Sequence, residues 1–224
     1  MTAARRQQAL EVWKFGGASL ADGPAIARAA TRIAEHGGPL LVVASALGGV
    51  TDLLLEGATH AAEGRDDEAT RIARTLGDRH RAAAKAVLGR GKALGEALAA
   101  IDASVAEYRD LCRAVAVLRH LAPRTRDALV SRGEQLSATI VAAAITGARR
   151  PAQFVDALDV IRTDEIHGGA APKRVETALL SDRILKPLLK KQIVPVVPGF
   201  IGRGPDDSIT SLGRGGSDLT ATLL

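Results

Sequence analysis

The first part of the chain alternates short apolar runs with a stretch of helical periodicity. Residues 12–15 are a short β-prone run, and residues 40–45 form a continuous apolar run that is typical of a strand buried on both faces. Between them, residues 22–36 place apolar side chains at spacings of three and four, behind Asp22 as a favoured N-cap. The pattern predicts a strand–helix–strand unit with parallel strands and a right-handed crossover.

The middle of the chain has only helical periodicity. Apolar side chains recur every three or four positions over about 64–122, with one interruption at Gly89-Arg90-Gly91. We therefore expect a helical hairpin that packs on or beside the sheet. His80 and Cys112 in this segment are interpreted as structural residues. The segment would also suit a dimer surface, which the sequence does not decide.

The last hundred residues return to short strands and helices. We expect helices over 136–145, over 172–191 with a kink or break at Pro187, and from Leu219 onward, with strands at 154–157 and 193–202. Glu134 would then lie in a first helical turn, three residues after Ser131. That spacing fits a capping box, and the alternative is a carboxylate that binds an ammonium group.

Glycine-rich turns follow the first two predicted strands. Lys14 stands two residues before Gly16-Gly17, and Ser45 precedes Gly48-Gly49, with Thr51 as the expected N-cap of the next helix. Parallel strands bring such turns to one edge of the sheet, where ligands of open α/β sheets bind. An ammonium beside free backbone amides can hold a phosphoryl group, whereas the alternative for Lys14 is a solvated charge.

A third glycine-rich stretch, residues 211–218, places Arg214 and Asp218 among three glycines and two serines. Free backbone N–H groups in such a loop form an anion-binding concavity, and the planar guanidinium matches a carboxylate or phosphate. An ordinary surface turn is the alternative for this stretch taken alone.

Composition narrows the classes of function. The 224 residues are 46% hydrophobic and 25% charged, which suits a globular protein of one large domain or two lobes. The net charge of +5 comes from scattered Arg residues with few aromatics between them, which favours anionic small molecules over nucleic acid. The single cysteine suits a reducing cytoplasm, and the apolar runs are too short to span a membrane. Residues 1–10 are expected to be a flexible leader.

Four motifs in order resemble the aspartate kinase branch of the amino-acid kinase superfamily: KFGGAS at 14–19, GEQLS at 133–137, VVPGFIG at 196–202 and LGRGGSD at 212–218. The resemblance implies an α/β/α sandwich around a mainly parallel sheet, C-terminally truncated, with the helical hairpin as an insertion. It implies transfer of the ATP γ-phosphate to L-aspartate, giving 4-phospho-L-aspartate for lysine, threonine and methionine synthesis.

The same resemblance implies residue roles. Lys14 and Asp218 are the expected catalytic residues, and Mg²⁺ would be held by the ATP phosphates, with no metal ligand from the protein. The residues expected to bind aspartate are Ser45, Thr51, Glu134, Ser211, Arg214 and Ser217. Those expected at the phosphates of ATP are Lys14, Gly16, Gly17, Ser19, Gly215 and Gly216.

The chain departs from the family pattern in two residues and in length. Ala18 stands where Thr is usual and Gln135 where Arg is common, and neither changes a residue assigned above. We expect residues 11–224 to be the amino-acid- and phosphate-binding part of the domain, without the nucleotide lobe and regulatory ACT domains, and inactive as a kinase by itself. It would work as a homo-oligomer or within a larger chain. The alternatives are a non-catalytic amino-acid-binding module and a kinase for another amino-acid carboxylate.

Overall fold

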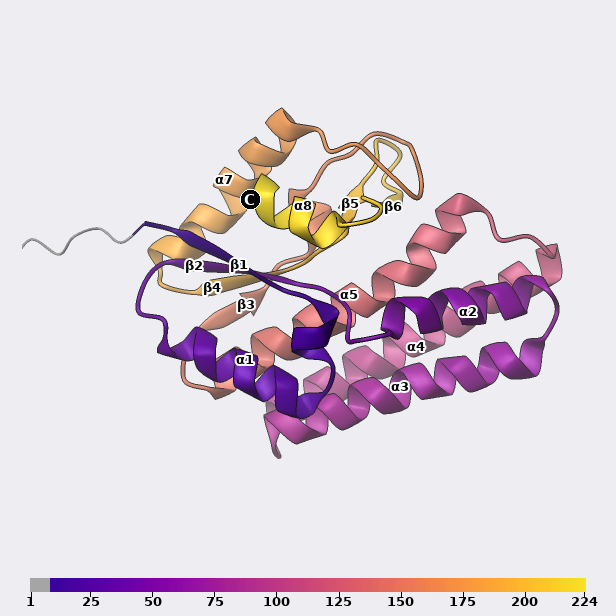
Figure 1. The fold of residues 1–224 in the computed structure, drawn as a ribbon, viewed down its shortest axis with the longest axis horizontal. Coiled ribbons are helices and arrows are strands. Elements are labelled where there is room, and N and C mark those ends of the chain that lie inside the picture. Colours follow the sequence, from indigo (N-terminus) through magenta and orange to yellow (C-terminus); the bar gives the residue numbers. More distant parts are fainter. Residues whose placement is uncertain (1–8) are drawn as a thin grey trace, which may run out of the picture.

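A computed structural model of the protein describes residues 9–224 (Figure 1). Residues 1–8, most of the expected leader, lie outside the described residues. The strands β1 (Glu11–Phe15), β2 (Leu40–Ala44), β4 (Val194–Pro198) and β3 (Ala152–Phe154) form one parallel sheet in that order. The first two strands pair over their full length, from Glu11 opposite Leu40 to Phe15 opposite Ala44.

Helices cover both faces of the sheet. The helices α1 (Gly23–Glu35) and α5 (Pro123–Gly147) lie on one face, and α7 (Arg174–Lys190) and α8 (Gly216–Leu223) lie on the other (Figure 1). Strand β2 is buried throughout, and its side chains alternate between two hydrophobic cores: Leu40, Val42 and Ala44 in one, Leu41 and Val43 in the other. The expected α/β/α sandwich with a mainly parallel sheet is thereby confirmed.

A helical layer extends beyond the sheet. The helices α2 (Val50–Ala62), α3 (Asp66–Leu88) and α4 (Lys92–Leu118) pack together, and α3 and α4 form the expected hairpin with its turn at Gly89–Gly91 (Figure 1). The buried Tyr108 hydroxyl donates a 2.8 Å hydrogen bond to the Leu54 carbonyl and ties the hairpin to α2. His80 and Cys112 are both buried here, as a structural role requires.

Helix α5 differs from the expectation in a way that matters for the site. It begins at Pro123, which occupies the first helical turn, rather than near Leu136. Glu134 therefore lies in the interior of the helix, and the capping-box interpretation with Ser131 is wrong. The Ser131 hydroxyl instead donates to the Ala128 carbonyl within the same helix, at 2.9 Å.

Other boundaries are also corrected. Gly49, in the left-handed conformation at φ 73°, is the N-cap of α2, so Thr51 is not. Asp156 does not end a strand; it caps the short helix α6 (Ala157–Val160) by accepting from the Leu158 N–H at 3.0 Å. Pro187 lies within α7 without ending it. Helix α8 begins at Gly216, so its first turn contains Asp218.

The expected strand over 193–202 is two strands. Strand β4 ends at Pro198, and β5 (Ile201–Arg203) pairs antiparallel with β6 (Ile209–Ser211) in a separate hairpin. Phe200 makes the break between them, with a left-handed φ of 71° that strands do not adopt. No helix of the described residues combines the length and apolar character that crossing a membrane requires.

Candidate active site

A hollow of about 380 Å³ opens at the carboxyl edge of the parallel sheet, where β1 and β2 end. Its walls are the ends of these strands, the β2–α2 turn, helix α5 and the loop that leads into α8. Ten residues expected at the site line it: Lys14, Gly17, Ser45, Thr51, Glu134, Arg214, Gly215, Gly216, Ser217 and Asp218.

Two glycine turns touch at this edge, as the parallel topology requires. A Cβ on Gly17 would lie 3.3 Å from the Ala46 carbonyl oxygen and from the Gly48 Cα. A Cβ on Gly48 would in turn lie 3.2 Å from the Gly17 carbonyl oxygen. A side chain at either position would make tighter contacts than normal, so one turn would have to move by a few tenths of an ångström.

Lys14 and Asp218 meet across 204 positions of sequence. The Lys14 Nζ lies 3.1 Å from Asp218 Oδ1 and 3.2 Å from Oδ2. The Lys14 side chain is 26% exposed and that of Asp218 is 70% exposed, so the pair adds little to stability. Both residues line the hollow, so the pair places an ammonium and a carboxylate at its wall.

Glu134 lies at the wall of the hollow, 4% exposed, with no hydrogen-bond partner for Oε2 among the described residues. Burial raises the pKa of this carboxyl to about 8, and the backbone N–H groups of Glu134 and Ala46 only partly oppose that rise. A buried carboxylate without a partner is costly unless a cation comes to it. The side chain is therefore suited to a ligand that carries a positive charge.

Arg214 stands on the other side of the hollow, in the loop before α8. It is exposed, and its guanidinium has no hydrogen bond or ion pair to any of the residues that the structure describes. The glycines on both sides of it, Gly213 and Gly215, have left-handed φ values of 75° and 74°. These turns present the free fork of donors to a carboxylate or phosphate.

The start of α8 is seated closely on the end of β4. A Cβ on Gly199 would lie 2.6 Å from the Ser217 Cβ and 2.9 Å from its Cα. A side chain at position 199 would therefore push against the start of α8, the helix whose first turn carries Asp218.

Three of the expected site residues do not line the hollow. Ser211 is buried, and its hydroxyl donates to Asp127 at 2.6 Å, which leaves it no hydrogen for a substrate. Ser19 is exposed in the short 3-10 helix Gly17–Leu20. Gly16 lies beside the site, since a Cβ there would be 3.4 Å from the Lys14 Nζ.

Sequence reasoning missed other residues of the site. Phe200 and Asp52 line the hollow, and Asp127 holds Ser211 from beneath. The position of Phe200 after a buried strand and a glycine could have indicated it, because that strand ends at the same sheet edge as β2. Nothing in the sequence marked Asp127. Within residues 9–224 there is no cluster of three or more His, Cys, Asp or Glu that could hold a metal ion.

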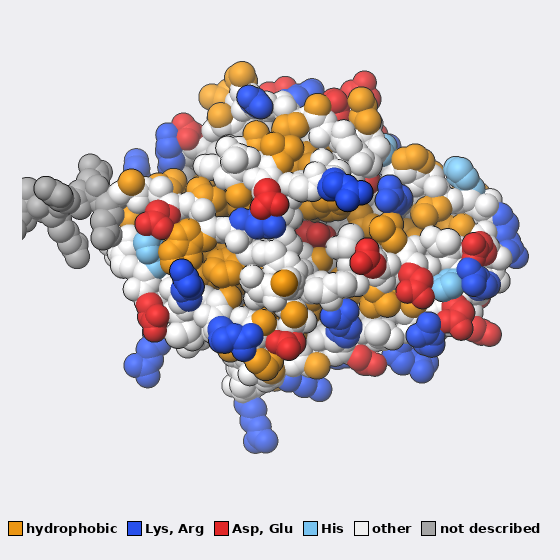
Figure 2. Space-filling model, in the orientation of Figure 1, with side chains coloured by type: hydrophobic (Ala, Val, Ile, Leu, Met, Phe, Trp, Pro, Cys, Tyr) orange, Lys and Arg blue, Asp and Glu red, His pale blue; other side chains and the backbone are white. Residues whose placement is uncertain are grey.

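The surface around the site carries charges of both signs. Figure 2 shows Lys and Arg interspersed with Asp and Glu on this face of the molecule, with apolar groups between them. On this face the positive charges are therefore interspersed with negative ones and are not gathered in one basic patch.

Comparison with known proteins identifies relatives of this architecture. Residues 10–224 match the model of the amino acid kinase family. The lysine-sensitive aspartokinase 3 of Escherichia coli is 33% identical over 213 residues, which is 95% of this chain and 45% of that protein. Aspartokinase 1 of Arabidopsis thaliana is 38% identical over 121 residues, 53% of this chain and 21% of that protein.

Solved structures agree with these matches. Aspartokinase III from E. coli in complex with aspartate and ADP superposes with a TM-score of 0.84 at 30% identity, over 96% of this chain and 46% of that one. Aspartate kinase from Clostridium acetobutylicum shares the fold, with a TM-score of 0.73 at 21% identity, over 96% of this chain and 44% of that one. The chain spans about half the length of the E. coli protein.

Proposed function

The chain belongs to the amino acid kinase family, and from this premise we propose that its site serves transfer of the ATP γ-phosphate to the side-chain carboxylate of L-aspartate. The observation that carries the proposal is that two ionisable groups of opposite type line the hollow: the buried Glu134 carboxyl, which has no partner for Oε2, and the exposed Arg214 guanidinium, which has no protein partner among the described residues. A free α-amino acid supplies the matching ammonium and α-carboxylate. The product, 4-phospho-L-aspartate, would supply lysine, threonine and methionine synthesis.

The amino-acid half of the site follows from these charges. Glu134 binds the ammonium and Arg214 the α-carboxylate, so the remaining carboxylate of aspartate is directed toward Lys14. Ser45, Thr51 and Ser217 line the same hollow and offer hydroxyl groups to the ligand. An N-acetylated amino acid fits less well, because its neutral amide would leave the Glu134 carboxylate without a cation.

The phosphate half uses the ammonium and the glycine turns. The acceptor carboxylate is ionised at neutral pH, so the reaction needs no general base, only positioning and neutralisation of phosphoryl charge. Lys14 contacts the transferring phosphoryl group, with Asp218 holding its ammonium in place. The backbone of Gly16, Gly17, Gly215 and Gly216 lies close to the phosphates, and Ser19 completes the set of expected phosphate residues.

Mg²⁺ would arrive with the nucleotide. The described residues contain no acidic cluster for a metal ion, and Asp218 is already paired with Lys14. The metal would neutralise phosphate charge and be held mainly by phosphate oxygens. ATP is the proposed donor, in keeping with the ADP that the E. coli relative holds together with aspartate.

The test is a calorimetric titration of the chain with L-aspartate and with N-acetyl-L-aspartate at pH 8. We expect aspartate to bind and the acetylated compound to bind at least about tenfold more weakly, since it lacks the charge that Glu134 requires. Equal binding of both compounds, or no binding of aspartate, would refute the proposal. We assign Ser211 no contact with the ligand, because its hydroxyl already donates to Asp127.

Turnover is tested separately by a coupled assay of ADP release. We predict that the 224-residue chain shows no aspartate-dependent turnover on its own, and observed turnover would overturn that prediction. In that case Lys14→Ala is the matched negative control, because it removes the ammonium from the site while disturbing only an exposed ion pair. A homo-oligomer or a larger chain stays a prediction as well.

A further inference from the structure

We propose that Asp127 is a positioning residue for the Arg214 loop, defined as residues 211–218, and so sets where the α-carboxylate of the substrate is held. The proposal rests on the function proposed above for Arg214. Asp127 is assigned no ligand contact; it acts through Ser211, the first residue of the loop.

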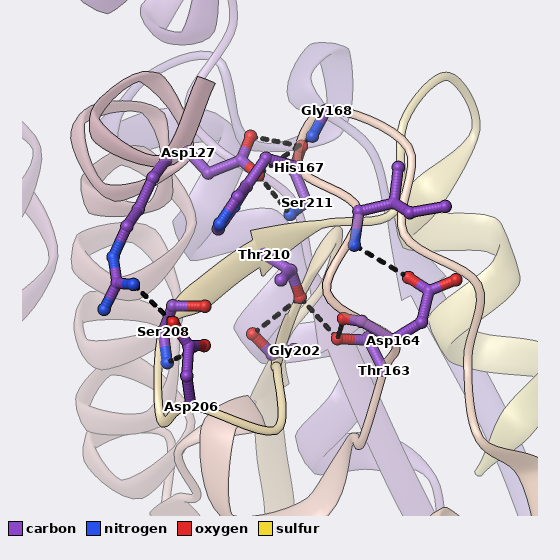
Figure 3. Close-up of polar contacts among 12 residues, drawn as sticks. Asp127, Thr163, Asp164, His167, Gly168, Gly202, Asp206, Ser208, Thr210 and Ser211 are labelled. Carbon is purple, nitrogen blue, oxygen red and sulfur yellow. Dashed lines mark hydrogen bonds and ion pairs between the residues drawn. The ribbon is translucent and has the colours of Figure 1, made fainter. Parts of the chain in front are cut away.

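Asp127 is a buried carboxylate, 1% exposed, in the second turn of α5. Its Oδ1 accepts the Ser211 hydroxyl at 2.6 Å. Its Oδ2 accepts the N–H groups of Ser211 at 3.0 Å and Gly168 at 2.9 Å, and lies 3.1 Å from the His167 Nδ1 (Figure 3). No Lys or Arg of the described residues pairs with it, so hydrogen bonds to loop atoms are what stabilise this buried charge.

The loop needs such an anchor because its own backbone is permissive. Gly213 and Gly215 stand on both sides of Arg214, and glycine loses more conformational freedom on ordering than any other residue. The Ser211 contacts with Asp127 hold the start of the loop, and the close packing of Gly199 against Ser217 holds its end. Arg214 lies between these two fixed points.

A second loop is held by the same carboxylate. Gly168 donates to Asp127, and the Ala170 N–H donates to the Ser211 carbonyl at 2.8 Å. A Cβ on Gly213 would lie 3.3 Å from the Gly168 carbonyl oxygen, so the 167–170 segment supports the Arg214 loop from the side. Asp127 therefore fixes both the loop and its support.

Helix α5 connects this anchor to the other end of the substrate. Asp127 and Glu134 are seven positions apart, two turns of one continuous helix, which places them on the same face about 10 Å apart along its axis. One rigid element thus carries the ammonium partner Glu134 and the anchor of the loop that carries Arg214. The separation between the two charges that bind the amino acid is set by that helix.

The same three residue types form the triad of hydrolases, but the geometry here is different. The Ser211 hydroxyl donates to Asp127 rather than to His167, and Ser211 is 2% exposed. A nucleophilic serine must be accessible and hydrogen-bonded to its base. The cluster of Asp127, His167 and Ser211 therefore holds the Arg214 loop in place and is not a catalytic triad.

Hydrogen exchange of the ligand-free chain tests the anchor directly. Asp127→Asn keeps the side-chain shape but places N–H donors where the carboxylate accepts. We expect amides of residues 211–218 to exchange at least about tenfold faster, following the loss of charge-assisted hydrogen bonds. Asp156→Asn is the matched control, since Asp156 also accepts a backbone N–H but caps α6 outside the site. Unchanged exchange in residues 211–218 would overturn the proposal.

If Asp127→Asn exchanges faster throughout the chain, Ser211→Ala decides, because it removes only the 2.6 Å hydroxyl contact. Faster exchange confined to residues 211–218 in that variant supports the anchor, and no local change contradicts it.

A ligand series then separates positioning from general loss of structure. Succinate lacks the ammonium group of aspartate, and β-alanine lacks its α-carboxylate. We expect Asp127→Asn to weaken aspartate and succinate by about tenfold and to leave β-alanine unchanged, because only the first two engage Arg214. Equal weakening of all three would refute the role. If the wild-type chain binds no aspartate, the proposed function fails, and the exchange experiment alone decides the role of Asp127.

Discussion

Binding of aspartate should release a proton from Glu134. In the empty site, burial raises the pKa of Glu134 to about 8, so at pH 7 only about a tenth of the molecules carry the carboxylate. An ammonium group beside it favours the charged form and lowers the pKa. Each aspartate bound at pH 7 should then displace about 0.9 proton, and at pH 9 only about 0.1. Below pH 8, the apparent affinity should rise roughly tenfold for each unit of pH increase, and above it should level off.

Calorimetry in buffers of different ionisation enthalpy measures this proton directly. The observed binding enthalpy, plotted against the ionisation enthalpy of the buffer, should have a slope of about 0.9 at pH 7 and about 0.1 at pH 9. The Glu134→Gln variant is the matched control, because the amide keeps the size of the side chain and has no proton to release. A wild-type enthalpy that is independent of buffer at pH 7 would show that Glu134 does not receive the ammonium.

Three further predictions concern residues around the hollow. Glu134→Gln should raise the free energy of unfolding by more than about 1 kcal/mol at pH 8. The pKa of Glu134 is higher in the folded than in the unfolded protein, so its contribution to wild-type stability is complete below about pH 4.5 and is lost as the pH rises through 8. Denaturant unfolding of the two proteins should therefore give the same free energy at acidic pH. Gly199→Ala should lower the free energy of unfolding by about 1–3 kcal/mol and weaken aspartate binding, because its Cβ would lie 2.6 Å from the Ser217 Cβ. Gly37→Ala is the control: its Cβ would meet nothing within 4 Å, so thermal stability and binding should stay unchanged. Lys14→Ala should change stability by less than about 1 kcal/mol, because its ion pair is exposed, yet abolish calorimetric binding of inorganic triphosphate; retained triphosphate binding would remove Lys14 from the phosphate site.

The sheet could be predicted because its signals are local. The continuous apolar run at 40–45 is short and lies between turn residues, which is typical of a strand buried on both faces, and the glycines at 16–17 and 48–49 mark the ends of two strands. Their convergence then follows from parallel topology rather than from any contact that must be guessed.

The start of α5 could not be predicted in the same way. The predicted helix covered 136–145, whereas α5 extends back to Pro123. Side chains of its first two turns have distant partners: Asp127 binds two loops, and Arg124 pairs with Asp206 in the β5–β6 turn. Local sequence preference is overridden where side chains find distant partners. The sequence left a capping role for Glu134 open beside the ammonium-binding role that the family resemblance implied. The interior position in α5 removes the capping role and leaves Oε2 without a partner among the described residues.

Long-range pairs account for the other residues that were missed or misplaced. Ser211 belongs to a glycine-rich motif and was expected at the substrate, but its partner is 84 positions away on another element. Phe200 has a left-handed φ, which phenylalanine rarely adopts and which the sequence therefore does not predict. The spacing of the motifs thus predicted where the hollow lies. The residues that hold its loops in place could not be predicted, because they depend on contacts between segments that are distant in sequence and share no motif.

The central claim is that Glu134 and Arg214 bind the two α-substituents of L-aspartate. Calorimetric titration of aspartate at pH 8 into the wild-type chain, Glu134→Gln and Arg214→Ala tests it most directly. We predict measurable binding to the wild-type chain and weakening of at least about tenfold in each variant, since each loses a charge-assisted contact. Aspartate affinity that is the same in all three proteins would contradict it.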